Sequence, residues 1–294
     1  MKVIFIKART IHLIMCIFLI CMLSTGLSII PKAVDYEAEE VVTTIDAVKV
    51  PIIMYHSILK DSSKANDYTI SPALLESDIK YLAEHNYSFI LGKDLIDYVY
   101  FGKSLPEKAI LITFDDGHYN NYYYAMDILK KYNAKAIISP IGIECECYTE
   151  SIDENPNYAY CNINNLKEMV DSGVFEIANH SYNLHDYGTR KGSKILEYED
   201  VSSYENLFIE DTLKAESYFE NELACEITAY TYPFGAYCDQ SEEILKELGY
   251  KITFITQDKT NIITRSADSL YKLSRYNRPA GISTEDFIKK MSLE

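Results

Sequence analysis

Short apolar runs alternate with amphipathic helical patterns along this chain, from residue 50 almost to its end. The runs are rich in β-branched and aromatic residues and cover residues 50–56, 88–91, 108–112, 135–140, 174–178, 227–232 and 250–255. Alternating strands and helices form parallel sheets, because a parallel connection needs a crossover long enough to hold a helix. With a further strand expected at residues 270–273, the pattern predicts an α/β fold, a distorted or incomplete (β/α) barrel that forms a single domain over residues 50–294.

Polar residues follow several of the predicted strands directly. His56 ends the first run, Asp115 and Asp116 end the strand that begins near residue 108, and His180 and His185 follow the run at 174–178. In a barrel of parallel strands the chemical groups collect at the carboxyl ends of the strands, because those ends open on one face. We therefore expect these five residues to face a single site.

Adjacent carboxylates such as those of Asp115 and Asp116 repel each other unless a positive charge lies beside them. A divalent metal supplies that charge, because one carboxylate can bind it while the other takes a proton from its bound water. His180 and His185 lie five positions apart, and from a loop both can turn toward one ion. With a carboxylate they form a two-histidine, one-carboxylate set that leaves positions for water and substrate. The alternative is a strand-to-turn junction with two solvated aspartates.

Three stretches of the chain resemble the first three motifs of the polysaccharide deacetylase family, also called the NodB homology domain or carbohydrate esterase family 4. They are Thr-Phe-Asp-Asp-Gly at 113–117, His-Ser at 180–181 with a second histidine downstream, and Tyr-Pro-Phe-Gly at 232–235. The resemblance covers roughly residues 108–275. It implies a distorted (β/α) barrel that removes acetyl groups from N-acetylated sugars with a divalent metal, most often Zn²⁺, with Co²⁺, Ni²⁺ or another divalent ion as alternatives.

The same resemblance implies roles for individual residues. Asp115 would be the general base, and the backbone N–H of Phe234 would help to hold the oxyanion, beside Tyr232 and Pro233 of the same motif. The metal would be bound by three residues: Asp116, His180 and His185. The reaction needs such parts, because an acetamide is unreactive until water is activated, the oxyanion is stabilised and the leaving amine is protonated.

The chain departs from the family's usual pattern in two places. The family's second histidine usually follows the first by four positions, whereas here it is His185, and the usual late Leu-x-His that supplies the general acid reads Leu-Ser-Arg at 273–275. Arg275 cannot act as an acid near neutral pH because its pKa is too high. Residues 51–56 resemble the branch that deacetylates poly-β-1,6-N-acetylglucosamine, which has a Tyr-His here as the acid and the longer histidine spacing. The resemblance thus makes His56 the acid and leaves Arg275 among the substrate-side residues, where it is expected to pair with and orient Asp115.

The N-terminal region carries targeting signals. Basic residues in 1–10 precede a nearly uncharged run at 11–30, and an acidic segment at 31–49 follows. We interpret these segments as a cytoplasmic tail, a signal-anchor or transmembrane segment and an exposed linker. The domain at 50–294 is then extracellular on the cell membrane, or secreted if the N-terminal segment is a cleaved signal peptide.

We expect structural roles for His118 and for the five cysteines that follow the uncharged run at 11–30. Cys145 or Cys147 with Cys161 could tie down the segment 145–162, which is predicted to be an inserted loop, and a free thiol is the alternative. His118 directly follows the glycine of the first motif. We expect it in a surface turn, with a substrate contact as the alternative.

The balance of charge limits the partners. The formal net charge of −16 argues against nucleic acid and against anionic membrane surfaces, because both are negatively charged. A neutral polymer, or one that becomes cationic, raises no such conflict. No protein partner is predicted.

The leading prediction is a metal-dependent polysaccharide N-deacetylase, a hydrolase of carbon-nitrogen bonds other than peptide bonds, that acts on N-acetylglucosamine polymers at the cell surface. The same chemistry on peptidoglycan or chitin oligomers is the nearest alternative. A catalytically inactive polysaccharide-binding protein is a second alternative, which the absence of the late histidine and of any Trp favours.

Overall fold

The computed structural model describes residues 46–291 of the chain. The expected cytoplasmic tail, the expected anchor and most of the expected linker lie outside these residues. Val48 and Lys49, which the sequence assigns to the linker, belong to strand β1 (Val48–Val50). Within residues 46–291, no helix has both the length and the apolar character needed to cross a membrane.

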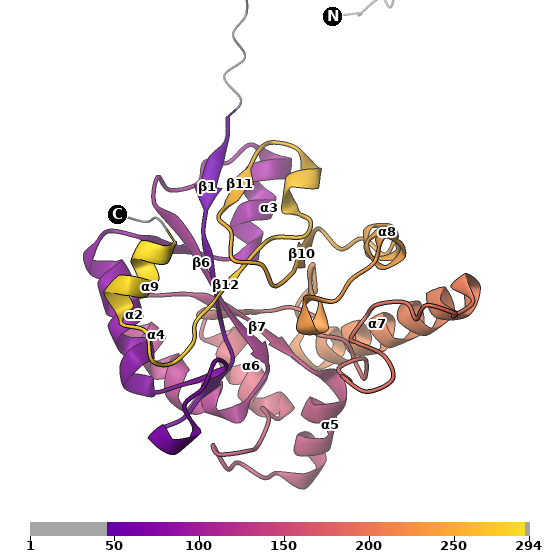
Figure 1. The fold of residues 1–294 in the computed structure, drawn as a ribbon, viewed down its shortest axis with the longest axis horizontal. Coiled ribbons are helices and arrows are strands. Elements are labelled where there is room, and N and C mark those ends of the chain that lie inside the picture. Colours follow the sequence, from indigo (N-terminus) through magenta and orange to yellow (C-terminus); the bar gives the residue numbers. More distant parts are fainter. Residues whose placement is uncertain (1–45, 292–294) are drawn as a thin grey trace, which may run out of the picture. The chain divides into compact units, whose positions relative to one another are not determined.

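A parallel sheet forms the centre of the described structure (Figure 1). Neighbouring strands are hydrogen-bonded in the order β12-β2-β6-β7-β8, and β5 pairs with the first part of β6. The strands span Ile52–Tyr55 (β2), Ser88–Ile90 (β5), Ala109–Asp116 (β6), Ala136–Pro140 (β7), Phe175–Ile177 (β8) and Tyr276–Asn277 (β12). β9 (Ala229–Thr231) and β10 (Ile252–Phe254) form a second parallel pair. Single parallel bridges join Asn179 to Tyr230 and Phe254 to Leu273, so the strands come round toward β12 without a closed ladder. The predicted distorted or incomplete (β/α) barrel is confirmed.

Most helices pack against the outer side of these strands, whereas α3 packs against side chains that point to the inner side. The helices are α2 (Pro72–Glu84), α3 (Gly92–Phe101), α4 (Met126–Lys131), α5 (Gly142–Ser151), α6 (Ile163–Asp171), α7 (Val201–Leu223), α8 (Asp239–Glu247) and α9 (Thr284–Lys290). Apolar residues of α3 are buried with the inward side chains of β2, β7 and β10, whereas those of the other helices join a separate, larger cluster. The two clusters mark the inside and the outside of the barrel.

The alternation of side chains along β6 decides where its two carboxylates lie. Ile110, Ile112 and Phe114 are buried in the outer cluster, whereas Leu111 is buried in the inner one. Because successive side chains of a strand point to opposite faces, Asp115 follows Leu111 into the barrel. The strand therefore delivers one buried carboxylate to the inside of the barrel at its open end.

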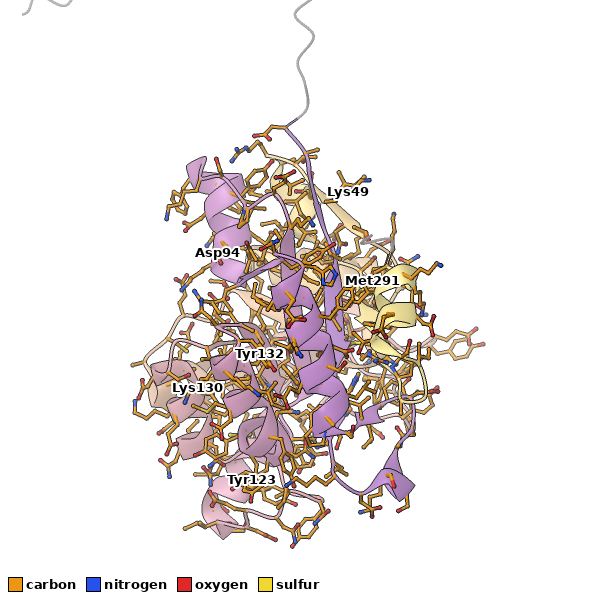
Figure 2. All side chains as sticks on the ribbon, turned by 90° about the vertical axis from the view of Figure 1, so that its left-hand side faces the viewer. Lys49, Asp94, Tyr123, Lys130, Tyr132 and Met291 are labelled. Atoms are coloured by element: carbon orange, nitrogen blue, oxygen red, sulfur yellow. The ribbon has the colours of Figure 1, made fainter. Side chains whose placement is uncertain are left out.

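Helix α2 begins as its sequence predicts. The side chain of Ser71 accepts a hydrogen bond from the N–H of Leu74 (3.1 Å), and Pro72 occupies the first turn. Figure 2 shows the side of the molecule on which α2 lies. On the same side, Tyr132 directly follows α4 and Met291 directly follows α9. Apolar residues of α2, α4 and α9 are buried in the outer cluster together with outward side chains of β2 and β6.

Two local predictions are wrong, and three short strands were missed. The segment 145–162 is not one inserted loop, because its first part belongs to α5, a helix whose apolar residues do not gather on one face. Residues 270–273 hold only the single bridge of Leu273, and the last strand is β12. The short strands β3 (Ser57–Ile58), β4 (Thr69–Ile70) and β11 (Asn261–Ile263) were not predicted.

The five cysteines within residues 46–291 are all free thiols. Cys145 and Cys161 are buried in the outer cluster. Burial raises the pKa of the Cys145 thiol to about 12. The expected disulfide is therefore not formed, and the alternative of a free thiol applies.

Candidate active site

The carboxyl ends of the strands open into a cleft of about 910 Å³. This volume lies within the range of small-molecule sites in proteins, about 300–1,000 Å³. The predicted residues that line the cleft are His56, Asp115, Asp116, His180, His185 and Phe234. The structure thus brings the polar residues that follow the strands together in one cleft.

The backbone at the rim of the cleft is turned sharply. Asp116, Ser181 and Phe234 adopt left-handed conformations, with φ of 67°, 67° and 58°. Such a conformation costs a non-glycine residue about 1–3 kcal/mol. Gly117 completes the first of these turns at φ 75°, where an added Cβ would lie 2.7 Å from the Cα of Pro140. The backbone therefore leaves the strand direction at Asp116, Ser181 and Phe234. Strained backbone conformations of this kind are typical of functional sites.

Asp116 lies among donors with metal-ligand geometry. Its Oδ1 is 3.4 Å from Nε2 of His180 and 3.2 Å from Nε2 of His185. The ligand atoms of these three residues all lie within 4.8 Å of one another. Tetrahedral ligands of Zn²⁺ at their usual bond lengths are about 3.4 Å apart. The set therefore fits a divalent metal.

Hydrogen bonds around His180 and His185 hold both rings toward Oδ1 of Asp116. Nδ1 of the buried His180 lies 2.7 Å from the carbonyl oxygen of Thr231. When Nδ1 carries the proton and donates it there, Nε2 keeps its lone pair toward Asp116. The carboxylate of Asp211 on α7 accepts from the N–H groups of Tyr182 (2.8 Å) and Asn183 (2.7 Å), which holds the loop that carries the second histidine. This loop explains how a spacing of five brings both rings to one point.

Asp116 is held as a carboxylate. Burial alone would raise the pKa of Asp116, but the neighbouring imidazoles of His118, His180 and His185 more than offset this effect and hold the pKa well below its usual range. An ionised carboxylate is the form that binds a cation.

Asp115 is paired with Arg275 below the floor of the cleft. Nη1 and Nη2 of Arg275 donate to its two oxygens at 2.6 and 2.8 Å, and Arg275 also donates to Thr113 Oγ1 (3.2 Å) and to the carbonyl of Ile255 (3.1 Å). Burial would raise the pKa of Asp115, but the charge and hydrogen bonds of Arg275 lower it below its usual value. The expected pairing is present. Arg275 is 1% exposed and lies behind Asp115, so it does not face the substrate side as the sequence suggests.

His56 lies beside the same carboxylate. Its Nε2 is 3.9 Å from Oδ2 of Asp115, and its ring meets the ring of Tyr68 edge-on at 4.9 Å. The side-chain amide of Asn121 donates to the His56 carbonyl (2.7 Å), which holds the backbone where β2 ends. Burial lowers the pKa of His56, against the opposing effect of Asp116 and Asp115, and thereby favours the neutral ring.

Only one side chain of the Tyr-Pro-Phe-Gly motif faces the cleft. Phe234 lines it, with its ring 4.4 Å from the ring of His185. Tyr232 is buried in the outer cluster, where its hydroxyl donates to Glu242 (2.9 Å), and Pro233 is buried at the turn. Tyr232 and Pro233 therefore build the turn that presents Phe234.

His118, for which a surface turn was the leading expectation and a substrate contact the alternative, lines the cleft together with two tyrosines that were not predicted. His118 lies 3.3 Å from Oδ2 of Asp116, rather than in a free surface turn. Tyr68 and Tyr187 line the cleft from loops after β3 and β8. No pattern in the sequence marks these two tyrosines among the 26 of the chain.

The sequence model of the polysaccharide deacetylase family matches residues 102–253. This chain belongs to the polysaccharide deacetylase family. The poly-β-1,6-N-acetyl-D-glucosamine N-deacetylase of Staphylococcus aureus is 27% identical over 214 residues, which cover 71% of this chain and 68% of the relative. The family makes the protein a hydrolase and accounts for the order of its motifs.

Solved structures of deacetylases share the fold. The de-N-acetylase of Aggregatibacter actinomycetemcomitans superposes with a TM-score of 0.67 at 25% identity, covering 82% of this chain and 98% of its own. IcaB from Ammonifex degensii superposes with a TM-score of 0.65 at 25% identity, covering 79% of this chain and 93% of its own. The deacetylase thus has the expected distorted barrel.

Proposed function

We propose that this deacetylase hydrolyses the acetamide groups of a poly-N-acetylglucosamine, with β-1,6-linked polymer as the leading substrate. The observation that carries the proposal is the convergence of Asp115, Asp116, His56 and two further histidines on one cleft. The substrate rests on the S. aureus relative, which is named for the β-1,6-linked polymer. The acidic charge of the chain does not oppose it, because the polymer is neutral and becomes cationic as acetyl groups leave.

Asp116, His180 and His185 would hold a divalent cation, with Zn²⁺ as the first expectation and Co²⁺ or Ni²⁺ as alternatives. Such a cation lowers the pKa of a bound water and polarises the acetyl carbonyl. These three residues offer ligand atoms from the ends of two strands. The hydrogen bond between Nδ1 of His180 and the carbonyl of Thr231 favours the tautomer of His180 whose Nε2 can bind a cation.

Asp115 accepts the proton that the attacking water loses. Both of its oxygens are fixed by Arg275, so the carboxylate is already oriented before the substrate binds. The low pKa of Asp115 keeps it ionised and therefore ready to accept a proton at neutral pH. Arg275 acts through Asp115 and is a positioning residue.

In its protonated form, which the carboxylates of Asp116 and Asp115 favour against the effect of burial, His56 would supply a proton to the amine as the carbon-nitrogen bond breaks. A carbon-oxygen bond to the water oxygen forms, acetate leaves, and the glucosamine nitrogen gains a proton. The distance of 3.9 Å between Nε2 of His56 and Oδ2 of Asp115 supports a shared reaction for the two groups. The backbone N–H of Phe234, on the αL turn at the end of β9, would bind the developing oxyanion.

The proposed place of action is the cell surface. The basic tail and uncharged run at 1–30 support an anchor with the catalytic domain outside, or secretion after cleavage. Protease treatment of intact cells tests this. Digestion of the domain without lysis is expected, and protection until lysis would contradict it.

The test of the activity is the release of acetate. The full chain is stripped of metal and then given Zn²⁺ or Co²⁺, with β-1,6-linked N-acetylglucosamine oligomers, chitin oligomers and peptidoglycan offered in parallel. Asp115→Asn is the matched control, because it keeps the size of the side chain and removes the base. Metal-dependent release from the β-1,6-linked oligomers that disappears in the control is expected. Release from another polymer alone would change the substrate. Binding of polymer without any release would favour a non-catalytic protein.

A further inference from the structure

The two oxygens of the Asp116 carboxylate face different histidines. Oδ1 faces His180 and His185, at 3.4 and 3.2 Å. Oδ2 faces Nε2 of His118, at 3.3 Å. The first pair belongs to the donor set described above, and the third histidine has no role in the proposed reaction.

His118 lies outside the donor set. Among the residues that the structure describes, the group whose ligand atoms all lie within 4.8 Å of one another comprises Asp116, His180 and His185, without His118. Donors to one tetrahedral ion lie about 3.4 Å apart. The imidazole of His118 is therefore on the outer side of the carboxylate, within hydrogen-bonding reach of the oxygen that the other two histidines leave uncovered.

The segment before α6 holds His118 in this position. The N–H of Tyr119 donates to the carbonyl of Ala159, and the N–H of Cys161 donates to the carbonyl of Gly117, both at 2.8 Å. Between these two bonds His118 and Tyr160 form an antiparallel bridge. The Tyr160 ring is stacked on the imidazole at 4.9 Å between centroids, with the planes 28° apart. The backbone and the ring plane of His118 are thus both fixed by residues about forty positions away.

We propose that His118 is a positioning residue that donates its Nε2–H to Oδ2 of Asp116 and so leaves Oδ1 as the single oxygen offered to a metal. This inference rests on the proposed function, because it concerns the same metal site. A carboxylate with one oxygen held in an outer hydrogen bond cannot swing to a two-oxygen binding mode. Partners of this kind orient the ligands that they contact, and their loss lowers metal affinity about 10- to 100-fold.

The experiment measures the affinity of the full chain for Zn²⁺ and Co²⁺ by titration calorimetry. His118→Phe keeps an aromatic ring to stack on Tyr160 and removes the donor, and its affinity is expected to fall about 10- to 100-fold. His118→Gln places an amide N–H near the position of Nε2 and is expected to recover most of the loss. The matched control is His85→Phe, because His85 is an exposed histidine stacked on Tyr81 (3.8 Å between centroids) outside the cleft, and this variant is expected to bind like the wild type.

The visible spectrum of the Co²⁺-loaded protein separates an outer role from direct binding. An outer hydrogen bond predicts that His118→Phe, at saturating Co²⁺, keeps the band positions and intensity of the wild type. A changed coordination number in the variant would overturn the proposal and make His118 a ligand. Tyr160→Ala provides a second variant that leaves His118 in place. It is expected to weaken affinity by less than His118→Phe does, because the ring is then less restrained.

The outcomes also separate this inference from the proposed function. If the wild type binds the metal and His118→Phe binds it within twofold, only the role of His118 is overturned. Equal losses in His118→Phe and His118→Gln would likewise overturn it, because the donor would then not be the cause. If the wild type binds neither Zn²⁺ nor Co²⁺, the proposed metal site is overturned and the role of His118 with it.

Discussion

Replacing Arg275 with methionine tests the central ion pair of the barrel. Arg275 is 1% exposed and Asp115 is 3% exposed, so the substitution leaves a buried carboxylate without its counter-charge. Removing one partner of a buried pair costs about 3–5 kcal/mol. Loss of the bond to the Ile255 carbonyl adds about 1 kcal/mol. Since domains have a free energy of unfolding of about 5–15 kcal/mol, the variant is expected to be marginally stable.

Urea denaturation of the metal-free protein measures this effect. With a slope of about 3 kcal/mol per molar urea, a total loss of about 4–6 kcal/mol moves the midpoint down by about 1.3–2 M. The double variant Asp115→Asn/Arg275→Met is expected to recover part of the loss, because no buried charge is then left without a partner. Lys103→Met is the control, since Lys103 forms an exposed pair with Asp97 (2.7 Å) and its removal is expected to cost at most about 1 kcal/mol. A loss below about 1 kcal/mol for Arg275→Met would refute the view that this pair is a fully desolvated one.

Three further predictions concern the activity, the pH dependence of stability, and the loop that carries His185. His56→Ala is expected to lower turnover about 10²- to 10⁴-fold with the affinity for Zn²⁺ unchanged by calorimetry, and a turnover near the wild-type value would remove His56 as the acid. Burial raises the pKa of Glu242 in the folded state above its value in the unfolded state. Between these two pKa values only the folded state keeps the proton on Glu242, so the free energy of unfolding falls as the pH rises from the lower pKa to the higher. The stability of Glu242→Gln relative to the wild type should therefore increase between pH 4 and pH 7 in denaturation curves, and a constant difference would contradict the assignment. Asp211→Leu removes the acceptor for the N–H groups of Tyr182 and Asn183 and is expected to lower Zn²⁺ affinity about tenfold while the circular dichroism spectrum is retained. Unchanged affinity would show that the loop does not need this support.

The strand ends were predictable because their signals are local. The β-branched run before Asp115 and the glycine after Asp116 predict a strand and a turn from adjacent residues alone. The same holds for the start of α2, where Ser71 and Pro72 are neighbours. A barrel then places such strand ends on one face without further information.

Other features depend on contacts between distant segments and could not be predicted from local patterns. His118 faces Asp116 because residues 159–161 pair with the turn at 117–119, and nothing near His118 in the sequence indicates this pairing. The burial of Arg275 depends on a carboxylate 160 positions away. Helix α5 lacks an apolar stripe, and its contacts with α6 and α7 outweigh its weak pattern.

Of the strained turns at Asp116 and Ser181, only the turn at Asp116 was predicted, because a glycine follows it in the sequence. Gly117 marks the first turn in the sequence, whereas Ser181 adopts its left-handed conformation without a glycine beside it. A hydrogen bond from its own N–H to the side chain of Asn179 (2.8 Å) supports that conformation. Side chains that stabilise a strained turn are visible only in the folded structure.

The described chain begins at the end of the barrel that lies away from the cleft. Asp46 is held there by Arg265 (2.6 Å) and by the hydroxyl of Tyr98 on α3, and β1 then leads into β2, whose other end carries His56. A purification tag, a surface linkage or a fused carbohydrate-binding module placed ahead of residue 46 should therefore leave the cleft accessible to a polymer. Immobilisation through this end is a practical route to a reusable reagent for trimming acetyl groups from soluble glycans.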